Sequence, residues 1–260
     1  STIRRQRQMC IRDSQQWIFT IFMILFGVNF NVYYLFLIRK PKDALRCEEM
    51  RGYLGIILVS TLLITWNIRG MFPDILTALK HAAFQVGSII TTTGFSSADF
   101  NQWPALSKTI LVLLMFVGAC AGSTGGGIKV SRILILCKAA RKEFQLYLHP
   151  NAVKKIKMDQ KTITHDILRS TNIYLTLYLL IFAVSILLIS LDNFDMTTNF
   201  TAVTATLNNI GPGLEIVGPM GNFSSFSYFS KCVLIFDMLA GRLEIFPLLI
   251  LFAPRVWKHR

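Results

Sequence analysis

Apolar segments of two different lengths alternate along this chain, and this alternation limits its fold more than any other feature. Segments 17–38, 52–68 and 170–191 are near the length of a membrane-spanning helix, which needs about 20 apolar residues. Two others, 75–90 and 196–207, are too short to cross about 30 Å of hydrocarbon at about 1.5 Å per residue. We therefore expect an all-α integral membrane protein in which the short segments are re-entrant half-helices.

The same order of segments occurs twice. Each unit contains a span, a half-helix, an irregular stretch with a glycine, and a second span. Residues 91–95 (TTTGF) follow the first half-helix and correspond to residues 208–212 (NNIGP) after the second, so that Gly94 matches Gly211. An internal repeat of this kind indicates two copies of one helix–pore-helix–helix unit.

Basic residues gather between the apolar segments. The chain has 27 Lys and Arg against 14 Asp and Glu, a net charge of +13, although 53% of its residues are hydrophobic. In a soluble protein such an excess would suggest a nucleic-acid partner, but no nucleic-acid-binding motif accompanies it. Segments 39–51, 138–169 and the tail after Pro254 fall on one side of the repeat topology, which the positive-inside rule assigns to the cytoplasm.

Cysteine and histidine are too scattered to predict a metal or redox site. The five cysteines contain no C-x-x-C pair, and the four histidines are equally dispersed. Segment 1–13 (STIRRQRQMCIRD) resembles a translated sequencing adapter, so we expect it to be non-native and leave it out of the fold. We expect no signal peptide, because the basic N-terminal segment is not followed by a cleavage site of small residues.

The two irregular stretches are rich in oxygen atoms. Non-helical backbone at membrane depth is tolerated only where it is buried in protein or lines a water-filled cavity. Residues 91–95 offer backbone carbonyls and threonine hydroxyls, and residues 208–212 offer carbonyls beside Pro212, which lacks an N–H. Such oxygens can replace the hydration shell of a monovalent cation, and each half-helix directs its partly negative end to the same place. The alternative is that both stretches are ordinary turns between spans.

A glycine-rich segment, GACAGSTGGGIK, interrupts the apolar stretch 105–136. Glycines and small polar residues let a helix break and swing. A G-x-x-x-G pair, Gly118 and Gly122, would suit close helix packing instead, and this alternative stays open. A phosphate-binding P-loop is disfavoured, because Ile128 stands where that motif requires lysine.

One arginine, Arg242, stands inside the apolar span 229–252. A midspan arginine costs at least about 2.5–3.5 kcal/mol on insertion scales, so it should face the bundle interior or water. It could belong to a structural ion pair. Asp237 and Glu244 are near it in sequence, but not at the spacing that places two side chains on one helix face.

Taken together, these motifs resemble the Trk/Ktr/HKT superfamily of potassium transporters, and most closely its bacterial Trk-type membrane subunit. The resemblance rests on TTTGF, GACAGSTGGGIKVSR, HPNAV, ATLNNIGPGL and GRLE, and it covers nearly all of the chain after Ser14. It implies four helix–pore-helix–helix units around one filter, half of which would be absent from this chain. The implied divisions are the last helix of the second unit (14–39), the third unit (40–140), a cytoplasmic linker (141–169) and the fourth unit (170–260).

The resemblance also implies roles for individual residues. Potassium would bind two filter strands, formed by Thr91, Thr92, Thr93, Gly94 and Phe95 and by Asn208, Asn209, Ile210, Gly211 and Pro212. The gate below the filter would comprise Gly122, Ser123, Thr124, Gly125, Gly126, Gly127, Lys129 and Arg242. In the family, a glycine in each filter strand is associated with potassium selectivity.

The resemblance implies potassium uptake across the bacterial inner membrane by a multi-pass protein. Such a protein is not an enzyme and holds no covalently bound cofactor, and potassium is its transported ligand. Family members pair as homodimers and bind a cytosolic, nucleotide-binding Trk regulatory subunit, and we expect no nucleic-acid partner. Two alternatives stay open: a sodium-permeable member of the family, and a non-conducting membrane scaffold or regulatory subunit.

Overall fold

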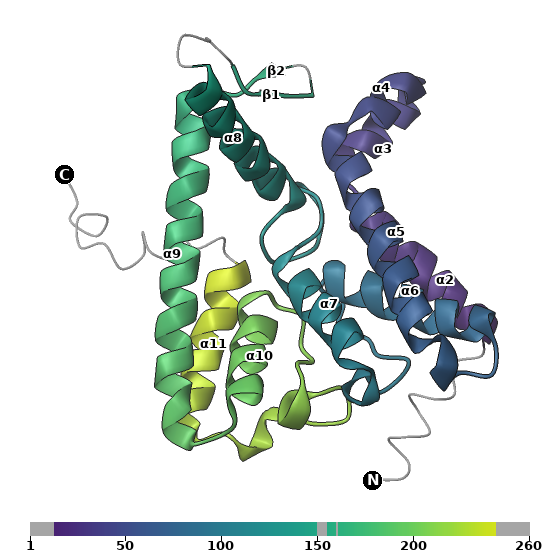
Figure 1. Ribbon diagram of the computed structural model, residues 1–260, viewed down its shortest axis with the longest axis vertical. Helices are drawn as coiled ribbons and strands as arrows, with labels where there is room; N and C mark the ends of the chain where they lie inside the picture. The colour runs from purple at the N-terminus through teal and green to yellow at the C-terminus, as the bar shows by residue number, and fades with distance from the viewer. Residues whose placement is uncertain (1–12, 150–154, 160, 243–260) are drawn as a thin grey trace.

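The computed structural model describes residues 13–149, 155–159 and 161–242, and within them the chain is helical apart from one small hairpin (Figure 1). Of the adapter-like segment 1–13, all but Asp13 lies outside the described residues. The α-helices are α2 (Asp13–Phe26), α3 (Phe30–Leu37), α4 (Pro41–Arg46), α5 (Glu48–Ile68), α6 (Ile75–Ile90), α7 (Ala105–Phe116), α8 (Val130–Leu148), α9 (His165–Ile189), α10 (Met196–Leu207) and α11 (Tyr228–Arg242). Short 3₁₀ turns lie at η1 (Arg69–Met71), η2 (Phe100–Gln102), η3 (Ser190–Asp192), η4 (Glu215–Val217) and η5 (Phe223–Ser225).

Two groups of three helices repeat one plan: α5, α6 and α7 pack together, as do α9, α10 and α11. Each group has its own apolar core, around Tyr53 and Leu111 in the first and around Tyr178 and Leu207 in the second. The end of α7 joins the two cores, because the Phe116 ring lies 5.5 Å from that of Phe182 in α9. The groups therefore stand side by side, and α7 is the helix of the first group that lies next to the second (Figure 1).

Both half-helices have the bounds that the apolar pattern predicts, Ile75–Ile90 for α6 and Met196–Leu207 for α10. Asp195 caps α10: its carboxylate accepts the backbone N–H of Thr198 at 3.0 Å and the Thr198 hydroxyl at 2.5 Å. Asp74 occupies the same place before α6 but makes no side-chain capping bond. A capping carboxylate therefore acts only in the second half-helix.

The apolar segment 17–38 does not form one continuous helix. Helices α2 and α3 meet at 91°. A Cβ on Gly27 would lie 2.1 Å from the hydroxyl oxygen of Tyr53, so a larger residue where the chain turns would have to displace the Tyr53 ring. Asn29 then restarts the helix by accepting the backbone N–H of Asn31 at 2.9 Å. The apolar pattern does not predict the bend, because the residue packed against Gly27 is Tyr53, which belongs to another helix, α5.

Segment 138–169 is more ordered than a polar connection suggests. Helix α8 continues to Leu148, and α9 begins at His165. Between them lies a hairpin of β1 (Lys157–Met158) and β2 (Lys161–Thr162), antiparallel, with Lys157 opposite Thr162 and Met158 opposite Lys161. The hairpin stands beside the end of α8 (Figure 1).

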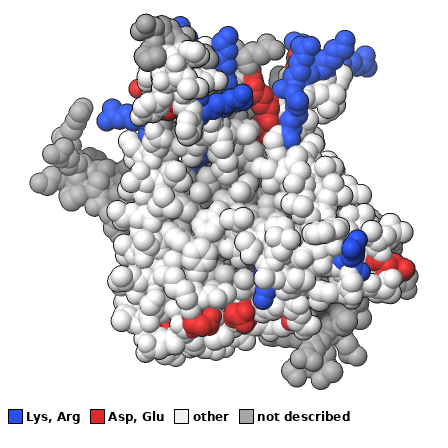
Figure 2. Space-filling view, viewed as in Figure 1, with Lys and Arg blue, Asp and Glu red and all other residues white. Residues whose placement is uncertain are grey.

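Length and composition allow two helical runs, Glu48–Met71 and His165–Asp192, to cross a membrane, and the bent α2–α3 pair adds a third if it is one span. Lys and Arg gather at the end of the molecule that carries α4, α8 and the hairpin (Figure 2). The positive-inside rule assigns this basic end to the cytoplasm. The half-helices α6 and α10 then approach the membrane centre from the opposite side.

Replacing the α10 cap should destabilise the protein. We expect Asp195→Ala to lower the free energy of unfolding by about 0.5–2 kcal/mol, as loss of an N-cap does elsewhere. The hydrogen bonds from the Thr198 hydroxyl and backbone N–H hold the pKa of Asp195 below its ordinary value. A lowered pKa means that the cap stabilises above the ordinary carboxyl pKa and is lost as pH falls through the lowered value.

Thermal unfolding of the purified protein in detergent, followed from neutral to acidic pH, checks this. The difference in Tm between wild type and Asp195→Ala should shrink on acidification, whereas Asp74→Ala should differ little from wild type at any pH. A difference in Tm for Asp195→Ala that is the same at every pH would contradict the capping role.

Candidate functional site

The first irregular stretch begins where α6 ends in a Schellman turn. The backbone N–H of Thr92 donates to the carbonyl of Ile89 at 3.0 Å, and that of Thr93 donates to the carbonyl of Ser88 at 2.9 Å. Thr92 has φ +55°, a left-handed conformation that β-branched residues rarely adopt. The chain therefore reverses away from the helix with its N–H groups already bonded.

The second stretch repeats this geometry at matching positions. The N–H of Asn209 donates to the carbonyl of Thr206 at 3.0 Å, and that of Ile210 donates to the carbonyl of Ala205 at 2.8 Å. Asn209 has φ +57°, close to the value at Thr92. Two half-helices with little sequence in common thus end in the same turn.

The two stretches touch each other at Gly94. A Cβ on Gly94 would lie 2.1 Å from the carbonyl oxygen of Ile210, and its φ of +77° also favours glycine. Beyond the contact, the Asn101 amide and the Glu215 backbone exchange two hydrogen bonds, at 3.0 and 3.1 Å. The sequence-predicted filter residues of both units are therefore brought together.

Backbone carbonyls are the atoms that both stretches leave available. Among the described residues, no hydrogen bond is given to the carbonyl oxygens of residues 91–94 or 208–211. The Phe95 carbonyl is already used, because it accepts the Ser88 hydroxyl at 2.6 Å. These uncommitted oxygens can coordinate a cation, and the C-terminal ends of α6 and α10 add negative potential.

The threonine hydroxyls, which sequence analysis also offered as oxygen donors, are engaged within the protein. Thr91 donates to the carbonyl of Gly87 at 2.7 Å, and its hydroxyl lies 2.8 Å from that of Thr93. The Thr92 hydroxyl accepts the backbone N–H of Gly126 at 2.8 Å. The side chains therefore brace the stretch and leave the carbonyls as the free oxygens.

The glycine-rich segment forms a non-helical loop, residues 117–129, between α7 and α8. Its ends are held together, because the N–H of Gly118 donates to the carbonyl of Ile128 at 2.8 Å. Gly122 and Gly127 have φ of +68° and +71°. The helix-packing alternative for Gly118 and Gly122 is wrong, since neither glycine lies in a helix.

The loop lies directly against both stretches. A Cβ on Gly126 would lie 2.6 Å from the carbonyl oxygen of Asn208, and one on Gly125 would lie 3.4 Å from that of Thr91. Residues 123–127 also line a pocket of about 180 Å³ together with Arg242. A loop in this position can block a path that leads away from the carbonyls.

Two cationic side chains bind the loop backbone. The Arg242 guanidinium donates to the carbonyl of Thr124 at 3.0 Å, and the buried Lys129 ammonium donates to the carbonyl of Gly125. Asp237, which sequence analysis weighed as an ion-pair partner of Arg242, accepts the Ser185 hydroxyl at 2.6 Å instead. The other partner considered, Glu244, lies outside the described residues.

Sequence analysis missed Glu49, which anchors the base of the loop. Its carboxylate is 3% exposed and accepts the backbone N–H groups of Ala121 at 2.6 Å and Ser131 at 3.2 Å. It also accepts the Asn29 amide at 3.2 Å, which ties the loop to the α2–α3 bend. In sequence Glu49 stands in a charged segment, RCEEMR, and only its burial distinguishes it from Glu48.

Among the described residues, no group of three or more His, Cys, Asp and Glu side chains gathers as a metal-ion ligand set. The site therefore offers carbonyl oxygens and cationic loop contacts. This chemistry suits transient binding of a monovalent cation.

Removing the Glu49 carboxylate should release the loop. Glu49→Ala leaves three partly buried donors without their acceptor, and loss of the acceptor of a buried donor costs about 1–3 kcal/mol. We expect a large fall in Tm in detergent and a smaller one for Glu49→Gln, which keeps one oxygen acceptor. Glu48→Ala is the control, since Glu48 makes a partly exposed ion pair with Lys138, a kind of pair worth about 0–1 kcal/mol. Equal losses for Glu48→Ala and Glu49→Ala would refute the anchoring role.

Comparison with known proteins identifies the family. The family described as "TrkH: Cation transport protein" matches residues 71–259. The Trk system potassium uptake protein TrkH of Salmonella typhimurium is 39% identical over 246 residues, which cover 93% of this chain and 50% of that protein. TrkH of Escherichia coli K12 is 38% identical over the same length.

A solved structure agrees with these sequence matches. The crystal structure of the potassium transporter TrkH from Vibrio parahaemolyticus aligns with a TM-score of 0.86 at 33% identity, over 95% of this chain and 53% of that one. The chain thus spans about half the length of the relatives it matches. The predicted all-α membrane fold and the resemblance are both confirmed, and this chain belongs to the TrkH family of cation transport proteins.

Proposed function

We propose that this chain carries half of a potassium-selective pathway for uptake across the bacterial inner membrane. The observation that carries the proposal is the contact between the two stretches, in which the carbonyl oxygens of residues 91–94 and 208–211 accept no hydrogen bond from the described residues. The relatives are named as Trk system potassium uptake proteins, which supports potassium as the transported ion. Entry of one positive charge is favoured by about 2.3 kcal/mol per 100 mV of membrane potential.

In this proposal potassium binds residues 91–95 and 208–212, with the carbonyls of Thr92, Thr93, Asn209 and Ile210 nearest to the ion. Carbonyl dipoles replace water around a weakly hydrated monovalent cation without any covalent step. Gly94 keeps the two stretches in contact, because any side chain there would meet Ile210. The protein is a transporter and potassium is its cargo.

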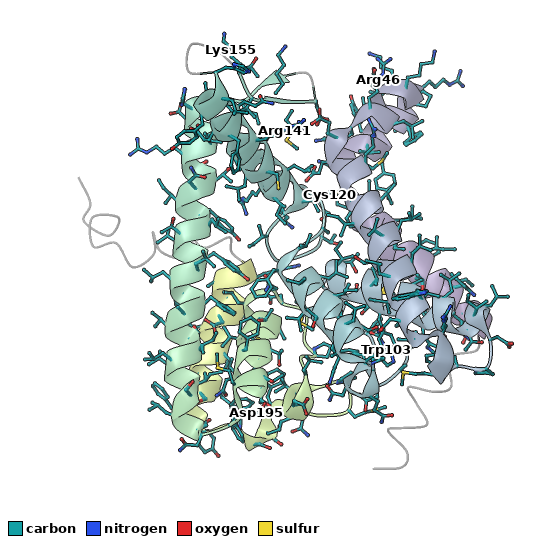
Figure 3. The ribbon with its side chains drawn as sticks, in the orientation of Figure 1. Arg46, Trp103, Cys120, Arg141, Lys155 and Asp195 are labelled. Atoms are coloured by element: carbon teal, nitrogen blue, oxygen red, sulfur yellow. The ribbon has the colours of Figure 1, made fainter. Side chains whose placement is uncertain are left out.

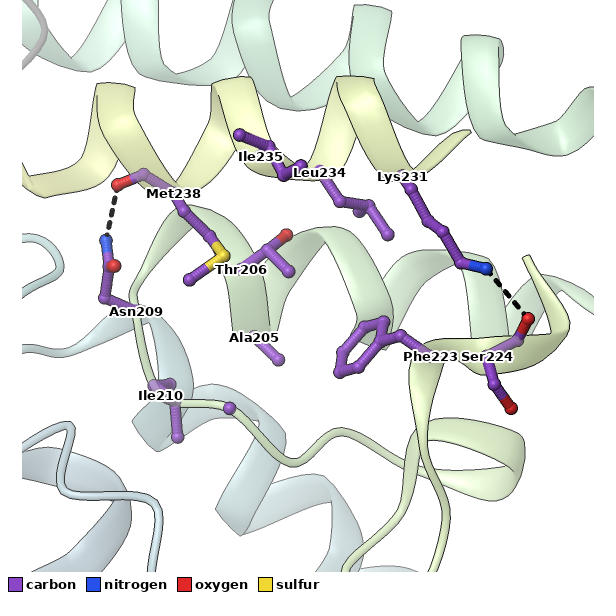
Figure 4. A pocket seen from close by; sticks show the side chains of 11 residues that line it. Ala205, Thr206, Asn209, Ile210, Phe223, Ser224, Lys231, Leu234, Ile235 and Met238 are labelled. Atoms are coloured by element: carbon purple, nitrogen blue, oxygen red, sulfur yellow. Dashed lines mark hydrogen bonds between the residues drawn. The ribbon is translucent and has the colours of Figure 1, made fainter. Parts of the chain in front are cut away.

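The remaining half of the pathway would come from two further units of the same kind, in addition to the units at 40–140 and 170–260. A pocket of about 600 Å³ opens beside the second stretch, between α10, α11 and η5 (Figure 4). It is lined largely by apolar side chains such as Leu234, Ile235 and Met238, together with the filter residues Asn209 and Ile210. A helix of a preceding unit would cover this face and complete the ring.

The gate in this proposal is the loop at residues 122–127, held by Lys129 and Arg242. With its glycines against Thr91 and Asn208, the loop closes the exit from the carbonyls, and the Arg242 charge adds an electrostatic barrier to a cation there. Movement of the loop requires these contacts to break. Pairing as a homodimer and binding of a cytosolic nucleotide-binding Trk regulatory subunit belong to the same proposal, as the means of moving the loop.

The uptake experiment uses a full-length chimera, in which residues 14–260 follow the missing half from the Escherichia coli relative. We expect it to restore rubidium uptake and growth at low potassium in a strain that lacks potassium uptake. Gly94→Ala should reduce uptake at least about tenfold, because its Cβ would meet Ile210 at a positive φ. Gly55→Ala is the control, since a Cβ there has open space. Growth no better than with empty vector would contradict the proposal, and equal sodium uptake would favour the sodium-permeable alternative.

A second prediction concerns the bond between filter and loop. Thr92→Val removes the acceptor for the Gly126 N–H but keeps a β-branched shape, whereas Thr92→Ser keeps the hydroxyl. Loss of about 1 kcal/mol favours opening roughly fivefold. We expect faster thiol labelling of a Ser123→Cys reporter in Thr92→Val, in a background without the exposed Cys137 and Cys232.

Thr92→Ser and Thr65→Val should label at the wild-type rate. Thr65 is the matched control, because its buried hydroxyl donates only within α5, to the carbonyl of Thr61. Identical labelling of Thr92→Val and Thr92→Ser would show that the hydroxyl does not hold the loop.

A further inference from the structure

A second site lies at the basic end of the molecule, away from the carbonyl stretches. A pocket of about 200 Å³ is enclosed by the end of α8 and the strand β1, and it is lined by the basic residues Lys138, Arg141, Lys142, Lys155 and Lys157. Arg141 and Lys155 both stand at this end in Figure 3. We propose that this pocket binds the phosphate group of an anionic lipid headgroup at the cytoplasmic surface of the membrane.

The pocket wall is held in place by hydrogen bonds from α5 and α8. The Lys138 ammonium donates to the backbone carbonyl of Lys157 at 2.7 Å and to the Glu48 carboxylate. The Asp159 carboxylate, just after β1, accepts the backbone N–H of Glu48 at 2.7 Å. These bonds fasten the hairpin to both helices, so the basic side chains converge from two elements of fixed position.

The positive charge of the pocket is largely uncompensated. Glu48 pairs with Lys138, but among the described residues no ion pair is made by Arg141, Lys142, Lys155 or Lys157. Two other acids are near the pocket: the Asp159 carboxylate accepts the backbone N–H of Glu48, and Glu143 follows Lys142 and Arg141 at spacings that do not face each other on a helix. Four cationic groups around one concave surface suit a ligand that carries negative oxygen atoms, and arginine and lysine both bind phosphate.

Apolar side chains next to the pocket indicate that the phosphate belongs to a lipid. Phe144, Tyr147 and Leu148 on the last turns of α8 are 73%, 87% and 76% exposed. Exposed aromatic and apolar side chains beside lysines are typical of the membrane–water interface, where ring and chain face the acyl region and the charge faces the headgroups. A lipid bound here would place its phosphate in the pocket and its chains along these residues.

The basic end of the molecule is also on the side of the membrane where binding of an anionic lipid headgroup is expected. The positive-inside rule places it on the cytoplasmic side, and pockets of this composition between helices on that side suit anionic headgroups. The inference does not depend on whether the carbonyl stretches conduct potassium, since the pocket is lined by α8 and residues 155–157 and contains no filter residue.

The test measures binding of fluorescent phosphatidylglycerol to the purified full-length chimera in detergent. The variant Arg141→Ala/Lys142→Ala/Lys155→Ala removes three charges from the pocket. We expect its affinity to fall at least about tenfold, since each basic group near an anionic surface contributes roughly fivefold. The matched control, Arg39→Ala/Lys40→Ala/Lys42→Ala, removes three charges from the other basic loop and should keep affinity within about twofold of wild type. Phosphatidylcholine should bind weakly to all three proteins.

A charge-conserving variant and a competition experiment with inorganic phosphate distinguish the remaining explanations. Arg141→Lys/Lys155→Arg should retain binding, and melting curves should match for every variant compared. Equal losses in the two triple variants would mean non-specific attraction to charge and would overturn the proposal. Inorganic phosphate that binds as tightly as the lipid would assign the pocket to a free anion instead. Unchanged lipid binding in the pocket variant, with loss of binding to the regulatory subunit, would assign the surface to a protein partner.

Discussion

A backbone that leaves the helical conformation inside a membrane must find its hydrogen bonds within the protein, and this constraint shapes the whole site. The Schellman turns after α6 and α10 satisfy this constraint for the N–H groups, because these groups donate hydrogen bonds to the last carbonyls of each half-helix. The carbonyls that follow are left without such partners among the described residues. Because the backbone N–H groups are hydrogen-bonded and the carbonyl groups are not, the two stretches present a surface of oxygen atoms. Such a surface can coordinate a dehydrated cation.

Glycine allows four backbone segments, the two stretches, the loop and α11, to meet with no side chains between them. Gly94 contacts Ile210 across the two stretches, Gly126 contacts Asn208 from the loop, and Gly241 contacts the carbonyl of Leu207 from α11, where a Cβ would lie 1.8 Å away. The contacts place the loop against the ends of both half-helices. The Thr92 hydroxyl and the Arg242 guanidinium then hold the tip of the loop, and Glu49 holds its base.

The sequence predicts those features of the structure that are determined by neighbouring residues. The limits of α6 and α10 follow from apolar length, and the equivalence of Gly94 and Gly211 in the two units, both at positive φ, follows from the repeat. The bend at Gly27 depends on Tyr53, and the role of Glu49 depends on Ala121 and Ser131, so neither is visible in a local pattern. The sequence offers both the hydroxyls and the carbonyls of residues 91–95 as cation ligands, and only the structure shows that the threonine hydroxyls are bonded within the protein while the carbonyls of residues 91–94 are free.

The central claim is that the carbonyls of residues 91–94 and 208–211 face a common ion. Anomalous diffraction from crystals of the full-length chimera grown with thallium(I), a heavy substitute for potassium, tests it most directly. The account predicts an anomalous peak bounded by the carbonyl oxygens of Thr92, Thr93, Asn209 and Ile210, and weakened by excess potassium. An ordered filter with no peak there, or with thallium bound only elsewhere in the protein, would contradict it.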